Sequence, residues 1–169
     1  MTKRNVLIQI KTTRWAIPRS LFEENVVPEE EDVECEDEEV LEPAEMLTEG
    51  RLITGSQRVE LVYEEGELTG MEGSVTTIGF ARADAGLVTM MRTGPVRTAM
   101  VFEEGKRHIC LYNTPFSEFE ICVHALHVEN RLLTDGVLIL DYLVEVHGAQ
   151  AERCQMTITV RAEADIGVF

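Results

Sequence analysis

The sequence predicts a single all-β domain over residues 1–169: a closed antiparallel up-and-down barrel of about eight to ten strands. Short segments in which apolar and polar residues alternate follow one another closely, with turn residues between them. No stretch of useful length has helical periodicity. Strands that are neighbours in sequence favour an up-and-down order, and closing such a sheet removes its exposed edges. A β-sandwich is the alternative architecture.

The bounds of each strand follow from this alternation and from the glycine, proline and aspartate residues that separate the segments. The first strand runs from Val6 to about Trp15 or Ile17, because apolar residues recur at every second position from Val6 to Ile10. The later strands are predicted at Met46–Thr54, Arg58–Glu64, Ser74–Ala83, Leu87–Arg92, Arg97–Glu103, Arg107–Asn113, Ser117–Val128, Val137–His147 and Glu152–Ala162.

Most of the negative charge belongs to one stretch after the first strand. Fourteen Asp or Glu and no Lys or Arg fall between Glu23 and Glu49, so the rest of the chain has a net charge of −2 out of −16. We predict that residues 23–45 form an acidic, mobile insertion, with room for a short helix over 36–41, and that 164–169 form a tail. Without clustered positive charge, the chain is not expected to bind nucleic acid.

Cysteine use and hydropathy predict a cytoplasmic protein. The four cysteines, Cys35, Cys110, Cys122 and Cys154, have no CxxC spacing and are expected to be reduced thiols. The apolar stretch near the N-terminus is too short for a signal peptide, and no run approaches the length of a membrane span. A membrane partner is therefore not expected, whereas a monomer and a homodimer are both compatible with the sequence.

The alternation also assigns side chains to the barrel interior. The segment Leu87–Arg92 allows two registers, one with Val88, Met90 and Arg92 inside and one with Leu87, Thr89 and Met91 inside. An interior arginine must be paired, either with a carboxylate such as Glu65 or Glu103 or with an anionic group of a ligand. The candidate ligand-binding residues are Arg92, Tyr63, Tyr142, Met90, Met100 and Phe102.

One hairpin gathers residue types that bind zinc. If its turn is centred near Pro115, His108 lies opposite Cys122, Cys110 lies opposite Glu120, and His124 follows on the same face. The other face, which contains Ile109, Leu111, Ile121 and Val123, is then the core. The candidate metal ligands His108, Cys110, Cys122 and His124 would lie on a solvated outer face, where scattered surface residues are the simpler interpretation. No cofactor is expected.

An ordered set of short motifs resembles the DUF1934 family of bacterial proteins, also called the YwiB-like family. The motifs are Tyr63-x-Glu65, Thr69-Gly70-x-x-Gly73-x-x-Thr76, Arg92-x-Gly94, Phe102-Glu103-x-Gly105, Tyr112-x-Thr114-x-x-Ser117-x-Phe119, Leu138-x-Leu140-x-Tyr142 and Met156–Val160. The resemblance covers residues 46–163 and the first strand. It implies a calycin-type, lipocalin-like barrel in a bacterial cytosolic protein of unknown function, and it supplies no catalytic residues. Ser117 stands where the family usually has glycine, and the first connection is longer than is typical.

The sequence contains no GxSxG, HExxH, Walker or Rossmann motif, so enzymatic activity is not expected. Two functional hypotheses follow. In the first, the barrel binds a small apolar or anionic ligand in its interior. In the alternative, the barrel is filled and the protein is a non-enzymatic interaction module that acts through its surface and its acidic loop. An apolar interior pocket of a few hundred cubic ångströms would favour the first.

Overall fold

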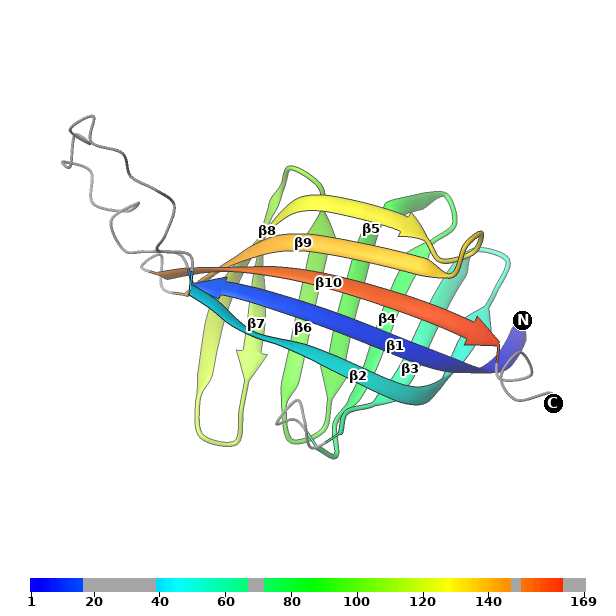
Figure 1. The fold of residues 1–169 in the computed structure, drawn as a ribbon, viewed down its shortest axis with the longest axis horizontal. Helices are drawn as coiled ribbons and strands as arrows, with labels where there is room; N and C mark the ends of the chain where they lie inside the picture. The colour runs from blue at the N-terminus through cyan, green and yellow to red at the C-terminus, as the bar shows by residue number, and fades with distance from the viewer. Residues whose placement is uncertain (17–38, 67–71, 147–149, 163–169) are drawn as a thin grey trace.

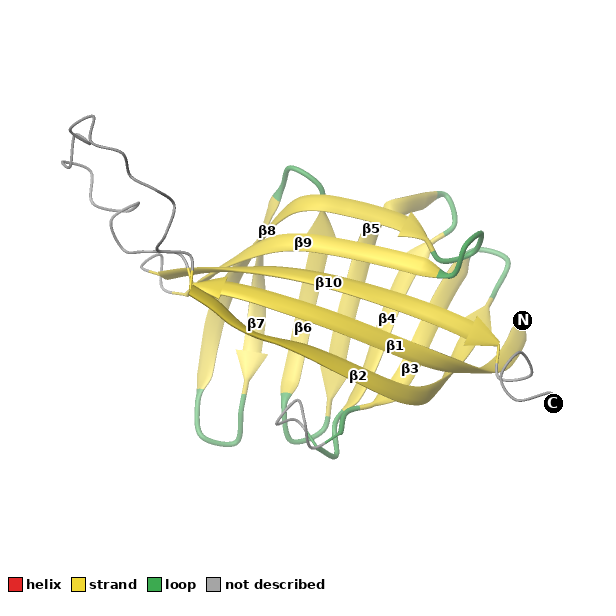
Figure 2. Ribbon diagram, viewed as in Figure 1, coloured by secondary structure: helices red, strands yellow, loops and turns green. Residues whose placement is uncertain are grey.

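The structure, a computed structural model, describes residues 1–16, 39–66, 72–146 and 150–162. It confirms the prediction of an all-β closed antiparallel barrel, and Figure 2 shows strands and loops without a helix in these residues. No helix in the described residues could cross a membrane. The strands are β1 (Thr2–Ala16), β2 (Glu39–Thr54), β3 (Arg58–Glu64), β4 (Val75–Ala81), β5 (Asp84–Thr93), β6 (Arg97–Glu103), β7 (Arg107–Asn113), β8 (Glu118–Arg131), β9 (Val137–Val146) and β10 (Gln150–Ala162).

Each strand pairs with the strands before and after it in sequence, and β1 also pairs with β10, which closes the barrel. All ten pairings are antiparallel. In Figure 1, β1, β2, β9, β10 and the later part of β8 form a front layer that crosses a back layer made of β3 to β7 and the start of β8. The up-and-down order places the connections β3–β4, β5–β6 and β7–β8 together at one end of the barrel, at the bottom of that view.

The middle of the barrel is packed with large apolar side chains from both layers. Alternate residues along each strand point inward, as strand geometry requires, and these residues have almost no exposed surface. The most completely buried are Phe80, Phe102, Ile8, Leu61, Ile78, Met90, Leu138, Leu140, Ile158, Val59, Val88 and Val123. Burying such side chains stabilises the fold by about 1.5–3 kcal/mol each.

The region after the first strand differs from the prediction. Residues 39–45, expected within the acidic insertion, belong to β2, and residues 39–41 are strand rather than helix. The reason is that β1 continues to Ala16 and offers a partner, so that Ala16 pairs with Glu39 and Lys11 with Glu45. The rest of the predicted insertion, residues 23–38, and the predicted tail, residues 164–169, lie outside the described residues.

Two neighbouring pairs of strands separate along part of their length. β2 pairs with β1 from end to end but with β3 only from Gly50 to Thr54. β6 pairs with β7 only from Arg97 to Ala99. The first separation leaves the half of β2 before Gly50 without a strand on its other side among the described residues, and it positions a hollow described below.

Candidate functional site

Arg92 faces the barrel interior. In β5, Val88, Met90 and Arg92 are buried, whereas Met91 is 52% exposed on the outer face. This is the first of the two registers that the sequence allows. The alternation of β5 therefore brings a positive charge to the inner wall, near the end of the barrel where β5 leads into β6.

A carboxylate from the same chain neutralises that charge. Arg92 Nη2 lies 3.0 Å from Glu65 Oε1, and the two side chains are 8% and 2% exposed. Arg92 Nε donates to the same oxygen at 3.2 Å and to Thr76 Oγ1 at 3.1 Å, and the Thr76 hydroxyl donates to Glu65 Oε1. Because the ion pair has no net charge, Arg92 offers no unopposed cation to an anionic ligand.

The ion pair is enclosed by two connections at this end of the barrel. The Glu65 amide donates to the carbonyl of Ser74 at 2.8 Å, and the Val96 amide donates to the Ser74 hydroxyl at 3.3 Å. Gly94 has a φ of +125°, and a Cβ there would lie 2.9 Å from the carbonyl oxygen of Gly73. Glycine at position 94 thus lets the β5–β6 turn lie directly against residues 73 and 74, which keeps the charges out of water.

The other candidate ligand-binding residues also point inward, but most of them are packed in the core. Met90 and Phe102 are fully buried, and Met100 and Tyr142 nearly so. The rings of Phe102 and Tyr142 meet edge to face with centroids 4.7 Å apart. Tyr63 also borders a hollow in the described part of the chain. Met90, Met100, Phe102 and Tyr142 pack in the core, and a ligand-binding role for the six residues stays a prediction.

Burial changes the acid–base behaviour of two of these tyrosines. The pKa of Tyr63 is raised well above its usual value, first by burial and then by the nearby Glu65 carboxylate. The pKa of Tyr142 is raised mainly by burial, with a contribution from the neighbouring Cys154 thiol. Both phenols therefore stay neutral in the folded barrel at pH values where an unfolded chain ionises, near pH 10.

This difference predicts a loss of stability at high pH. Below about pH 10 both states keep the phenol protons, and the contribution to stability is complete; above it, unfolding releases one proton per tyrosine. The free energy of unfolding should then fall by about 1.4 kcal/mol per pH unit for each buried tyrosine. Urea melts between pH 9.5 and 11.5 measure this slope. Tyr63→Phe and Tyr142→Phe should each reduce it by about that amount, and an unchanged slope in both variants would contradict the prediction.

The pairing of β7 with β8 differs from the register on which the predicted metal site depends. His108 pairs with Val123 and Cys110 with Ile121, one residue away from the predicted register. Cys110 consequently points into the core, whereas Cys122 pairs with Ile109, whose side chain is 77% exposed. The prediction that Ile109 and Leu111 belong to the core is therefore wrong. His108, Cys110, Cys122 and His124 do not share a face, and the described residues contain no group of three or more potential metal ligands.

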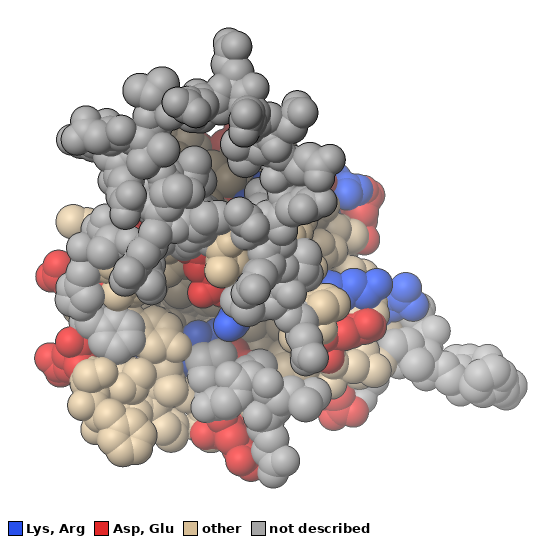
Figure 3. Space-filling model, turned by 60° about the vertical axis from the view of Figure 1, so that its left-hand side comes forward, with Lys and Arg blue, Asp and Glu red and all other residues tan. Residues whose placement is uncertain are grey.

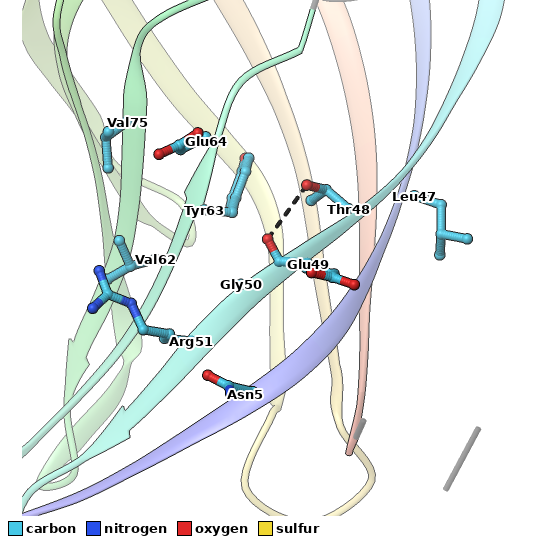
Figure 4. Close-up of a pocket in the computed structure, with 10 residues that line it drawn as sticks. All are labelled: Asn5, Leu47, Thr48, Glu49, Gly50, Arg51, Val62, Tyr63, Glu64 and Val75. Atoms are coloured by element: carbon cyan, nitrogen blue, oxygen red, sulfur yellow. Dashed lines mark hydrogen bonds between the residues drawn. The ribbon is translucent and has the colours of Figure 1, made fainter. Parts of the chain in front are cut away.

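A hollow in the described residues lies where β2 and β3 separate. It has a volume of about 740 Å³ and opens to solvent. Figure 4 shows β2 and β3 diverging from Gly50, with Thr48 and Leu47 on one side and Tyr63 and Glu64 on the other. The full lining comprises Asn5, Leu47, Thr48, Glu49, Gly50, Arg51, Val62, Tyr63, Glu64 and Val75.

Gly50 stands at the apex of this separation, which we call the β2–β3 split. A Cβ at this position would lie 2.4 Å from Ile8 Cδ1 and 2.6 Å from the carbonyl oxygen of Val62. Glycine is therefore required where the two strands begin to part. The sequence analysis placed the β2 residues of the split in a strand, Met46–Thr54, but did not name them as candidate site residues. No local signal in the sequence marks the split, since it depends on the long pairing of β2 with β1 and its short pairing with β3.

Charge on the described surface is mixed. Figure 3 shows acidic side chains at several places on the described part of the face, with basic ones mainly beside them. Around the split, Glu45, Glu49 and Glu64 are exposed carboxylates, and Arg51 is the cation among the lining residues. The edge of the split is thus polar and acidic, whereas its floor contains the phenol ring of Tyr63.

Comparison with known proteins agrees with this architecture. The ywiB protein from Bacillus subtilis, known from a crystal structure, has 19% sequence identity to this chain and a TM-score of 0.64, over 95% of this chain and 94% of that one. At this identity the similarity shows the fold alone. No curated protein matches the sequence. The model of a domain of unknown function, DUF1934, matches residues 30–158, which is most of the chain, and the protein therefore belongs to the DUF1934 family.

Proposed function

We propose that this protein is a non-enzymatic interaction module that binds an extended segment of a partner protein along the free edge of β2, in the β2–β3 split. The observation that carries the proposal is the unequal pairing of β2. This strand pairs with β1 from Glu39 to Thr54 but with β3 only from Gly50 onward. Among the described residues, the otherwise closed barrel therefore keeps an open edge along β2 before Gly50, in addition to the place where β6 and β7 separate.

Backbone groups on an open edge favour pairing with another strand. Each unpaired N–H and C=O group can form the hydrogen bonds of a sheet with an added segment, while pockets for alternate side chains give specificity. The edge from Glu45 to Glu49 spans about 16 Å in strand conformation. The adjoining hollow of about 740 Å³ provides room for side chains of the added segment, and the nearly buried Tyr63 is among its lining residues.

The charges at the split indicate the kind of segment that fits. Exposed Glu45, Glu49 and Glu64 favour a partner strand that carries lysine or arginine. They also disfavour pairing between the β2 edges of two copies, because like charges would then face each other. The proposed partner is thus a basic, extended segment of another protein.

The packing of the interior argues against the other hypothesis, a small ligand inside the barrel. Met90, Phe102 and Tyr142 fill the middle of the barrel, and Arg92 is already paired with Glu65. A ligand there would have to displace side chains from the core or break a buried ion pair. Binding in the split requires neither.

The proposal predicts that a synthetic octapeptide of alternating lysine and valine binds the split. Amide NMR shifts should move at Leu47–Gly50 and Val62–Glu64, and the same peptide with N-methyl groups at every second residue should bind at least about tenfold more weakly, since it lacks edge donors. Glu49→Lys should weaken binding of the lysine peptide, whereas Glu118→Lys, at an exposed position on β8, should change it little. Equal effects of the two variants would mean unspecific charge attraction and would overturn the proposal.

Proline variants test the edge itself. The N–H groups of successive strand residues point to opposite sides, so one of Leu47 and Thr48 donates toward β1 and the other toward the split. One of Leu47→Pro and Thr48→Pro should therefore leave the melting temperature almost unchanged and abolish peptide binding, and the other should destabilise the protein. If Leu47→Pro and Thr48→Pro both fold well and both bind the peptide fully, pairing along the β2 edge is excluded.

A further inference from the structure

We infer that the outer face of the back layer, β3 to β8, binds a second copy of this chain. This face carries large apolar side chains in the open: Ile109 is 77% exposed, Leu111 57% and Met91 52%. They lie on neighbouring strands together with exposed Ala99 and half-buried Val101. A contiguous apolar patch of this kind on a polar protein marks an interaction surface.

The strand register places these residues in a line with a charge at each end. Met91 of β5 pairs with Ala99 of β6, which pairs with Leu111 of β7. Followed across the sheet from β2 to β8, the line is Arg51, Val62, Thr77, Met91, Ala99, Leu111 and Glu120. Residues of one line share a face, so an arginine and a glutamate border an apolar centre.

The order of residues along this line is complementary to the same line in a second copy of the chain. Met91 lies on the middle strand, with Arg51 three strands away on one side and Glu120 three strands away on the other. A twofold axis along β5 places Met91 against its own copy and Val62 against Leu111 of the second copy. The same axis brings Arg51 of each copy to Glu120 of the other, which is the isologous arrangement of a homodimer. Charge complementarity therefore favours a second copy as the occupant.

The size of the face suits such an interface. Five strand spacings from β3 to β8 span about 24 Å, and strands of this length span about 23 Å. The projected area of about 550 Å² becomes larger when the corrugation of side chains is included, which approaches the ~800 Å² per partner of a standard interface. The described ends of the acidic stretch, Ala16 and Glu39, belong to the front layer, away from this face.

Sedimentation velocity of the full-length chain between about 1 and 200 μM tests the inference. The expected result is a concentration-dependent dimer. Leu111→Lys should weaken dimerisation at least about tenfold, because it places a charge in the apolar centre. Leu133→Lys is the matched control at an exposed leucine between β8 and β9, and it should leave the dimer intact. A monomer at every concentration, or equal effects of the two variants, would overturn the inference.

Charge reversal identifies the pairing within the dimer. Two single variants, Glu120→Arg and Arg51→Glu, should each weaken dimerisation about tenfold by placing like charges together. Glu120 lies outside the β2–β3 split. The double variant should recover affinity to within about threefold of the unmodified chain. If it is as weak as the single variants, Arg51 and Glu120 do not meet, and the proposed axis is wrong.

Discussion

Replacing Arg92 by methionine is expected to lower the free energy of unfolding by about 3–5 kcal/mol. The substitution keeps an unbranched apolar stem but leaves the Glu65 carboxylate buried at 2% exposure without its cation. Thr76 also loses the guanidinium that donates to it. Removing one partner of a buried ion pair costs much more than the pair contributes, because an uncompensated charge remains in the interior.

Equilibrium urea melts of four chains separate this explanation from a general effect of losing an arginine. Arg97→Met, at an exposed position on β6, should change stability by less than about 0.5 kcal/mol. The double variant Arg92→Met with Glu65→Leu should recover most of the loss, because it removes both charges together. If Arg92→Met behaves like Arg97→Met, the buried pair does not hold this end of the barrel together.

The strands could be predicted from sequence because their signals are local. Arg58–Glu64, Arg97–Glu103 and Arg107–Asn113 agree with the structure at both ends. The alternation is clear in these segments, and turn residues bound each of them. Arg92 was left open between two registers because Met90 and Met91 are equally apolar, and only the pairing of β5 with β4 and β6 decides between them.

The predicted register of the β7–β8 hairpin was wrong for a physical reason. Both faces of β7 are apolar, with Ile109 and Leu111 on one and Cys110 and Tyr112 on the other. Hydrophobicity alone assigns the isoleucine and leucine to the core, but here they form the exposed patch. The turn from 114 to 117 also has an even number of residues, so its centre lies after Pro115, and a shift of one residue exchanges the two faces.

The β2–β3 split could not be predicted because it depends on contacts between distant segments. Whether β2 has a second neighbour is decided by the lengths of β1, β2 and β3 together, and no local pattern encodes that. The partner of Arg92 is similar: the sequence offered Glu65 and Glu103, and only the connection after β3, which folds back through Ser74, brings Glu65 to the interior. Sequence therefore predicted the barrel, but it left the side of Arg92 open and did not predict the edge on which the proposed function depends.

Phe102→Ala is expected to destabilise the barrel by about 3–5 kcal/mol. The ring is fully buried, so its removal loses transfer free energy and leaves a cavity, and Tyr142 loses its edge-to-face partner. Phe116→Ala is the matched control, since Phe116 is 97% exposed in the β7–β8 turn and should matter by less than about 0.5 kcal/mol. Thermal and urea melts of the two variants provide the comparison.

The same variant distinguishes a filled barrel from a ligand-binding one. If Phe102 is core, the new cavity is apolar and dry, and a small aromatic probe such as benzene or indole should bind it and raise the melting temperature of Phe102→Ala but not of the unmodified chain. If Phe102 instead lined an open ligand pocket, its removal would enlarge space that already exists. Stability would then change little, and the unmodified chain would respond to the probe as well. Stabilisation by the probe only in the variant is the result that a packed interior requires, and it leaves the β2–β3 split as the place to look for a partner.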